Sequence, residues 1–307
     1  MERYLPEGSL YATRENRRAL RSPDGILQAA REGTILEGRA VMCDKDHHLH
    51  IDLGCMRGII PRSECAIGIE EGEVGDIAIL SRVNRYVMFK VSEVEMFGGQ
   101  PFAVLSRRRV QQECLRQYID RLIPGDVLPV RVTRLETFGA FCDIGAGICA
   151  LLPIDCISVS RIPHPSARLK SGQHIRVILK SRDEKGRITL TLKELLGTWE
   201  ENAALFSPGQ TVPGIVRSIE PYGIFIELTP NLAGLSEKVD GFCVGDQTGV
   251  FIKSINPAKM KVKLIVVGAV PSDAPPAELH YFFQGTHMDS FRYSPDICPR
   301  EIITTFG

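Results

Sequence analysis

The chain has 307 residues, and its 37 basic and 37 acidic side chains give no formal net charge. This length predicts two or three domains, and no apolar run approaches the roughly 18 residues of a membrane span, so we expect no membrane contact. The nine cysteines are scattered without a Cys-x-x-Cys pair, which argues against a disulfide framework and a structural zinc site. The amino terminus lacks the basic-then-apolar order of a secretory signal, so we expect a cytoplasmic protein.

Residues 1–32 form a polar arm of mixed charge at the amino terminus. The apolar spacing near residues 26–31 predicts a short helix. Such an arm is suited either to docking on a partner or to capping the domain that follows it.

A β module then follows in three copies. Each copy opens with a Gly-led strand and passes through a phrase in which two ring side chains stand three residues apart before an acidic residue. It later restarts at a second Gly-polar pair before an apolar run. The restarts are Gly75-Asp76, Gly172-Gln173 and Gly245-Asp246. Phrases that recur at similar spacing indicate duplicated domains.

The strand and turn pattern of each copy suits a small closed barrel of about five strands. We therefore predict an all-β protein of three tandem five-stranded barrels joined by short α-helices. The barrels are expected at residues 33–107, 124–193 and 208–267.

Amphipathic spacing predicts helices in the two linkers, residues 108–123 and 194–207. Trp199, the single tryptophan, is expected to be a packing anchor in the second linker. The carboxyl-terminal extension, residues 268–307, is rich in aromatic residues, and we expect it to fold against the third barrel because disordered tails are poor in such residues.

Charge is unevenly distributed along the chain. Residues 33–104 carry about −4 and residues 124–193 about +5, with Arg107-Arg108-Arg109 between them. A basic middle favours a polyanionic partner. The alternative for the arginine run is a solvated helix start.

The two ring phrases with full aromatic side chains predict a stacking surface. Gly139 and Gly223 allow the strand to bend between the two rings, so that both rings reach one exposed face. Bases stack on such rings with little sequence preference. The alternative is that Phe141 and Phe225 are core residues of their barrels. The basic residues expected to follow the phosphates beside the rings of the middle barrel are Arg131, Arg134, Lys180 and Arg187.

Residues 124–193 resemble the S1 RNA-binding domain, an OB-fold barrel, through the order Phe-Gly-Ala-Phe, Asp-x-Gly, Gly-Gln and Asp183-Glu-Lys-Gly-Arg187. Residues 208–267 resemble it strongly and 33–104 weakly, and the whole is similar to the bacterial ribosomal protein S1 group. The resemblance implies single-stranded RNA binding by stacking. In the middle barrel it assigns the rings to Phe138 and Phe141 and the loop pair to Asp183 and Arg187, although another alignment places Arg182 at the acidic position.

The other two copies match the same pattern less fully. In the third barrel, Tyr222 and Phe225 match the ring pair, and Asn256 and Lys261 fall near the loop pair. In the first barrel, His47 and His50 replace the rings. The family histidine falls on Pro153 in the middle barrel and on Pro61 in the first. We expect weak RNA binding by the first barrel, or a structural or protein-docking role.

The remaining clusters of reactive residue types give little support for a metal site or for catalysis. Cys43, His47, His48 and His50 have ligand types suited to a transition metal, but the spacing favours a His-rich surface strand, and we predict no metal. No nucleotide-binding or nucleophile motif is present, so we predict neither an enzyme nor a cofactor.

We therefore predict a monomeric protein of translation that holds single-stranded messenger RNA, with the small ribosomal subunit as a further partner. The middle barrel is expected to dominate binding and the third to assist. Two alternatives stay open: a protein–protein adaptor with degenerate barrels, and an accessory subunit of an RNA-processing or RNA-degrading enzyme.

Overall fold

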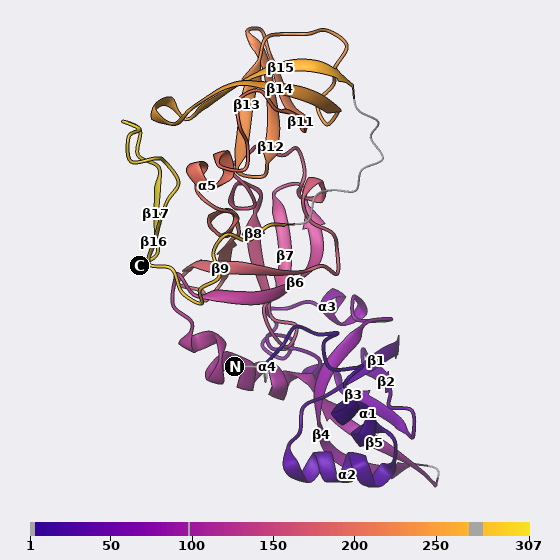
Figure 1. Ribbon diagram of the computed structural model, residues 1–307. Coiled ribbons are helices and arrows are strands. Elements are labelled where there is room, and N and C mark those ends of the chain that lie inside the picture. Colours follow the sequence, from indigo (N-terminus) through magenta and orange to yellow (C-terminus); the bar gives the residue numbers. More distant parts are fainter. Residues whose placement is uncertain (1–3, 98, 270–278) are drawn as a thin grey trace. The chain divides into compact units, whose positions relative to one another are not determined.

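The computed structural model describes residues 4–97, 99–269 and 279–307. Its strands form three closed five-stranded barrels and one two-stranded sheet, which confirms the predicted all-β class of tandem barrels (Figure 1). The described residues leave out residues 1–3 of the predicted arm, residue 98 of the predicted first barrel and residues 270–278 of the predicted extension. The chain divides into two compact units: residues 1–122 with 143–149, and residues 123–142 with 150–307.

The first unit contains the amino-terminal arm, the first barrel and a helix. Backbone amides of Gly8, Leu10 and Tyr11 donate to the buried carboxylate of Glu37, so the arm caps the barrel. Its strand order is β1-β2-β3-β5-β4. The elements are α1 (Arg14–Leu20), α2 (Pro23–Glu32), β1 (Leu36–Cys43), β2 (Leu49–Asp52), β3 (Arg57–Ile60), η1 (Arg62–Glu64), α3 (Ile77–Leu80), β4 (Tyr86–Phe97), β5 (Gln100–Ser106), α4 (Arg107–Gln117) and η2 (Ile119–Arg121).

The predicted strand restart at Gly75-Asp76 is wrong, because α3 follows this pair. In the second barrel the restart glycine donates its N–H to the opposite strand, from Gly172 to the Val132 carbonyl at 2.7 Å. Asn84 makes the same bond to Ala40 at 2.8 Å, with a φ of +64°. Asparagine tolerates this left-handed conformation better than most residues. Asn84 therefore takes the place of the glycine, directly before β4.

The second barrel has the strand order β10-β8-β7-β6-β9. Its core is dominated by branched aliphatic side chains such as Val130, Leu152 and Val177, all fully buried. The elements are β6 (Val127–Glu136), β7 (Gly139–Asp143), β8 (Cys149–Pro153), η3 (Ile154–Cys156), η4 (Pro165–Ala167), β9 (His174–Arg182) and β10 (Ile188–Thr191).

The third barrel has the order β11-β12-β13-β15-β14. Its elements are β11 (Thr211–Glu220), β12 (Gly223–Thr229), β13 (Leu232–Ser236), β14 (Gln247–Asn256), η6 (Pro257–Lys259) and β15 (Lys261–Ala269). The linker before it holds two short turns, η5 (Lys193–Leu196) and α5 (Trp199–Ala203), because Gly197 between them has a φ of +88°. Trp199 is 2% exposed and packs into the third barrel's core, as predicted.

Asn231, which is fully buried, ties the second barrel to the third. Its Oδ1 accepts from the Val159 amide, and its Nδ2 donates to the carbonyls of Lys193 and Gly197 at 2.7 and 2.8 Å. Tyr293 of the carboxyl-terminal extension also bonds this residue, because its Oη donates to the Asn231 carbonyl at 2.6 Å. One side chain therefore satisfies three backbone groups of the preceding barrel and linker.

The carboxyl-terminal extension packs on both barrels of the second unit. In Figure 1 it is the yellow segment that runs alongside β9 and ends in β16 (Ser290–Arg292) and β17 (Ile303–Thr305). Arg176 of β9 donates to the carbonyls of Phe283 and Gly285, and its guanidinium lies 5.7 Å from the Tyr281 ring centroid. The predicted packing on the third barrel is seen through Tyr293, but much of the extension covers the second barrel.

We expect Asn231→Ala to lower the free energy of unfolding by about 2–4 kcal/mol, because it leaves buried backbone groups without partners. Asn256→Ala is the matched control. Asn256 only caps the exposed η6 turn, through the Lys259 amide, so its loss costs about 1 kcal/mol. Urea unfolding of both variants measures the difference, and equal losses would contradict the role given to Asn231.

We expect docking of the extension to weaken as the pH rises. The Asp126 carboxylate, 2.7 Å from His287 Nδ1, raises the pKa of His287 above its usual value. A histidine whose pKa is raised by folding stabilises the fold fully below its unfolded pKa, about 6.5, and loses that contribution as the pH passes the folded pKa. Hydrogen-exchange protection of the Met288 amide, which bonds the Gly125 carbonyl, reports this docking.

The control for this pH effect is His287→Gln, which cannot titrate. Protection at Met288 should fall with pH in the parent chain and stay level in the variant. A parallel fall in both chains would show that another group controls docking.

Candidate nucleic-acid interface

The predicted ring pair of the middle barrel lies together at the surface. Phe138 stands in the turn before β7 and is 53% exposed, and Phe141 lies half-buried on β7. Their ring centroids are 5.9 Å apart at an interplanar angle of 87°. Phe141, for which the core was the alternative, is thus only half-buried, and its partner Phe138 is mostly exposed.

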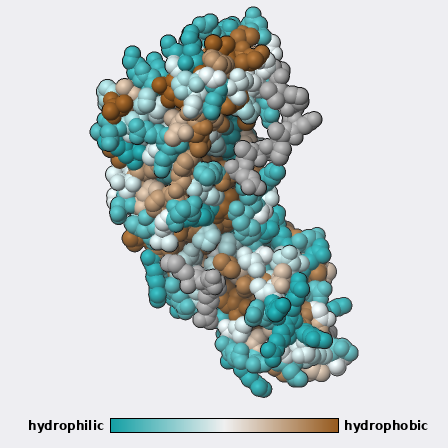
Figure 2. Space-filling view, viewed as in Figure 1, coloured by the Kyte–Doolittle hydropathy of each residue, from teal (hydrophilic) through white to brown (hydrophobic). Residues whose placement is uncertain are grey.

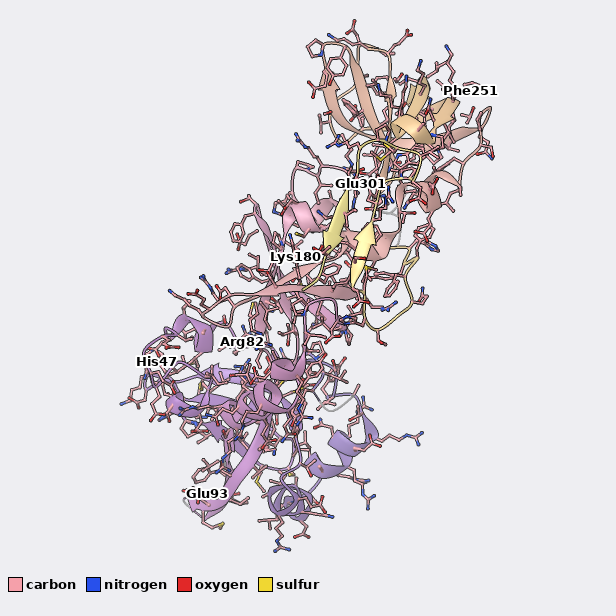
Figure 3. All side chains as sticks on the ribbon, turned by 90° about the vertical axis from the view of Figure 1, so that its left-hand side faces the viewer. His47, Arg82, Glu93, Lys180, Phe251 and Glu301 are labelled. Carbon is pink, nitrogen blue, oxygen red and sulfur yellow. The ribbon has the colours of Figure 1, made fainter. Side chains whose placement is uncertain are left out.

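The predicted cations of this barrel divide between the ring pair and other contacts. Arg134 places its guanidinium carbon 5.0 Å from the Phe141 centroid and bonds Glu136 at 2.9 Å. Arg131 instead donates to the Gly172 carbonyl at the turn before β9. Lys180, labelled in Figure 3, approaches Cys156 Sγ at 3.3 Å. Arg134 is therefore placed over a ring of the pair.

The loop pair at the β9–β10 turn forms an ion pair. Arg187 Nε lies 2.6 Å from Asp183 Oδ2, and the Arg187 side chain is 77% exposed. Bonds from the Arg187 side chain and backbone lower the pKa of Asp183. The strands β10, β8 and β7 are neighbours in the barrel. The strand β10 that follows the loop pair and the strand β7 at the rings are therefore separated by one strand, β8.

The third barrel repeats the ring geometry. Tyr222 is 67% exposed, and its centroid lies 6.3 Å from that of half-buried Phe225 at 89°. Both rings line a groove of about 770 Å³ along β12, β13 and β15. Lys261 lines this groove. Asn256, its cross-strand partner, uses its side-chain oxygen to cap η6 instead.

Three further lysines line the same groove and were not predicted from the sequence. Lys263 was detectable, because it shares the period-2 face of Lys261 on β15. Lys238 and Lys253 come from a loop and from β14, and only the fold brings them to the rings. The groove is also partly apolar, because exposed Val239 and Ile265 line it. Figure 2 shows hydrophobic residues, in brown, on the visible face of the third barrel.

The first barrel lacks the paired rings. His50 Nε2 lies 2.9 Å from Asp44 Oδ2, and this bond lowers the pKa of Asp44 to about 2. His47 lies on the β1–β2 loop with a φ of +61°, at the outer edge of this barrel in Figure 3, and its Nδ1 is 3.9 Å from Asp76. The two histidines thus engage different carboxylates and do not form a ring pair.

The arginine run is mostly engaged within the first unit. Arg107 is 3% exposed and pairs with Glu7 at 2.6 Å, while Arg108 pairs with Glu70 and Glu71. Arg109 is exposed. Two of the three arginines are therefore paired with carboxylates of the first unit.

The described part of the chain offers no group of three or more His, Cys, Asp or Glu side chains arranged to hold a metal ion. None of the helices in residues 4–97, 99–269 and 279–307 has both the length and the apolar character needed to cross a membrane.

Comparison with known proteins supports the resemblance. Residues 121–193, which include the middle barrel, match the family described as S1 RNA binding domain. The small ribosomal subunit protein bS1 of Leuconostoc lactis is 30% identical over 70% of this chain and 52% of the relative. The proteins of that name from Staphylococcus aureus (strain COL) and Chlamydia trachomatis are 30% and 28% identical over 73% and 84% of the chain. The chain spans about half the length of these curated relatives.

We expect Phe138→Ala to leave the fold intact, with a change in the free energy of unfolding below about 1 kcal/mol, because the ring is 53% exposed. Phe89→Ala is the matched control: this ring is fully buried in the first barrel, and its loss should cost about 3–5 kcal/mol. Urea denaturation compares the two. A large loss at Phe138 would make that ring part of the core.

Proposed function

We propose that this chain is a cytoplasmic, non-enzymatic protein of translation that holds single-stranded messenger RNA on its tandem barrels in association with the small ribosomal subunit. The observation that carries the proposal is the repeated ring pair: Phe138 with Phe141, and Tyr222 with Phe225, both edge to face with one ring well exposed. The bS1 relatives support the link to translation.

The chemistry of the two surfaces fits single-stranded RNA better than a double-stranded nucleic acid. An exposed aromatic face stacks on an unpaired base and contributes about 1–3 kcal/mol per base, whatever the base is. As phosphate partners we propose Lys261 and Lys263, which line the groove of the third barrel's rings, and Arg134, which stands over Phe141. Exposed Arg187 of the β9–β10 turn is the further proposed partner in the second barrel. The middle barrel is proposed to dominate because its residues 124–193 carry about +5.

Fluorescence anisotropy with a labelled, unstructured RNA of about twelve nucleotides tests the proposal, because this length is within the range that an OB fold covers. The Phe138→Ala, Tyr222→Ala double variant should bind at least about tenfold more weakly than the parent, since it loses one stacking face in each barrel.

The parent chain at low salt is the decisive control for this titration. If the parent does not bind, the barrels serve protein contacts, and an adaptor or a subunit of an RNA-processing enzyme becomes the function to pursue. If the parent binds and the folded double variant binds equally well, RNA is held elsewhere than on the rings.

We expect Arg187→Gln to flatten the salt dependence of RNA binding by roughly 0.7 in the log–log slope, the share of one phosphate contact on a single strand. Arg300→Gln is the matched control, since Arg300 is exposed on the extension and does not line the groove of the third barrel's rings. Titrations at four salt concentrations give both slopes. Equal slopes in the two variants would remove Arg187 from the interface.

A further inference from the structure

The first barrel has a groove on the face that carries the rings in the other two barrels. This groove has a volume of about 860 Å³ and is formed by β2, β3 and β5. The groove of the third barrel lies on β12, β13 and β15, which hold the same places in the barrel order. The lining of the first barrel's groove includes His50, Asp52, Arg57, Gln100 and Phe102.

The strand register shows which position Phe102 occupies. The parallel pairs Ile59–Val104, Leu151–Thr189 and Leu235–Lys263 are equivalent in the three barrels. Two residues before the second member of each pair stand Phe102, Arg187 and Lys261 respectively. The first barrel therefore has a ring where the other two barrels have a cation.

The register also places the missing cation. Arg57 on β3 pairs with Asp52 on β2, as Ala233 pairs with Glu227 in the third barrel. Arg57 is also the direct parallel partner of Phe102. The first barrel thus has one ring and one cation on adjacent strands: the cation comes from β3 and the ring from β5.

These side chains are not engaged in holding the fold together. Arg57 and Asp52 are both exposed, and among the described residues no ion pair to Arg57 lies within 4.0 Å. Asp52 bonds only the Gly54 amide of its own turn within that part of the chain. The acidic residues of the same phrase in the other copies, Asp143 and Glu227, are buried and fully bonded.

We propose that this groove binds one nucleotide of single-stranded RNA, with its base stacked on Phe102 and its phosphate on Arg57. The inference rests on the proposed function and adds a third site to it. A ring beside an unpaired guanidinium matches the two parts of a nucleotide, an aromatic base and an anion. His50 forms the opposite wall, on β2.

The charge of the barrel determines how this site binds. Residues 33–104 carry about −4, and exposed Glu93, labelled in Figure 3, and Glu95 lie on neighbouring β4. Like charges slow the approach of RNA and weaken its binding. Stacking on Phe102 therefore supplies most of the affinity of this site.

The test uses the full chain carrying Phe138→Ala and Tyr222→Ala, which removes the exposed rings of the other barrels. Its remaining binding of the twelve-nucleotide RNA at low salt is measured by anisotropy. Adding Phe102→Ala should weaken this remaining binding about five- to a hundredfold, whereas Phe102→Tyr, which keeps the ring, should preserve it.

Arg57→Gln in the same background should reduce the salt slope by roughly 0.7. Arg17→Gln is its matched control, because Arg17 is exposed on α1, outside the groove. Circular dichroism confirms that each variant is folded. In the parent chain, RNA carrying 4-thiouridine should crosslink to the peptide that contains Phe102, as identified by mass spectrometry.

The outcomes separate this inference from the proposed function. If the parent chain fails to bind RNA, the proposed function fails and the third site fails with it. If the parent binds but the double variant shows no remaining binding, or binding that Phe102→Ala leaves unchanged, the inference alone is overturned. Absence of a crosslink to the Phe102 peptide, with crosslinks to the other barrels present, also overturns it.

Discussion

The close approach of a glycine backbone to the next strand is the constraint on which the ring surfaces depend. A Cβ atom on Gly139 would lie 2.5 Å from the Leu152 carbonyl oxygen, and one on Gly223 would lie 2.3 Å from that of Ser236. Only glycine allows this contact, which no real Cβ can make. The two rings stand on either side of this close approach, and they form an edge-to-face pair with one ring well exposed. In the first barrel, His48 holds the equivalent position, and the ring pair is absent.

The acidic residue of the repeated phrase differs in burial and in bonding partners among the three barrels. Glu227 is buried between Arg168 and Arg217 in the second unit. Asp143 is buried within the first unit, where it accepts from the amides of Glu7, Gly145 and Gly147, and burial raises its pKa to about 7. Only in the first barrel is this carboxylate, Asp52, exposed on a groove. The copy without the ring pair is thus the copy in which this carboxylate is exposed.

The second unit carries both ring pairs in one compact body. Asn231 bonds the chain of the preceding barrel and linker, and the extension bonds both barrels through Arg176 and Tyr293. For the proposed RNA-holding function, two sites held in one body raise the effective concentration of the second site once the first is occupied, so affinity increases without new contacts. The linker turns are too short to act as a flexible tether. Buried Trp199 of α5 also fixes this linker to the third barrel.

Much of this protein was determined by its sequence alone. The triplication, the barrel class, the packing role of Trp199 and the proximity of Phe138 to Phe141 follow from local patterns, because strand period, turn residues and i, i+3 spacing are local properties. Tertiary structure decided what strand pairing brings together from distant positions: Lys238 and Lys253 beside Tyr222, and Arg57 beside Phe102. It also decided that Asn84 replaces a glycine and that Arg107 is buried, because both depend on backbone conformation and on partners far away in the chain.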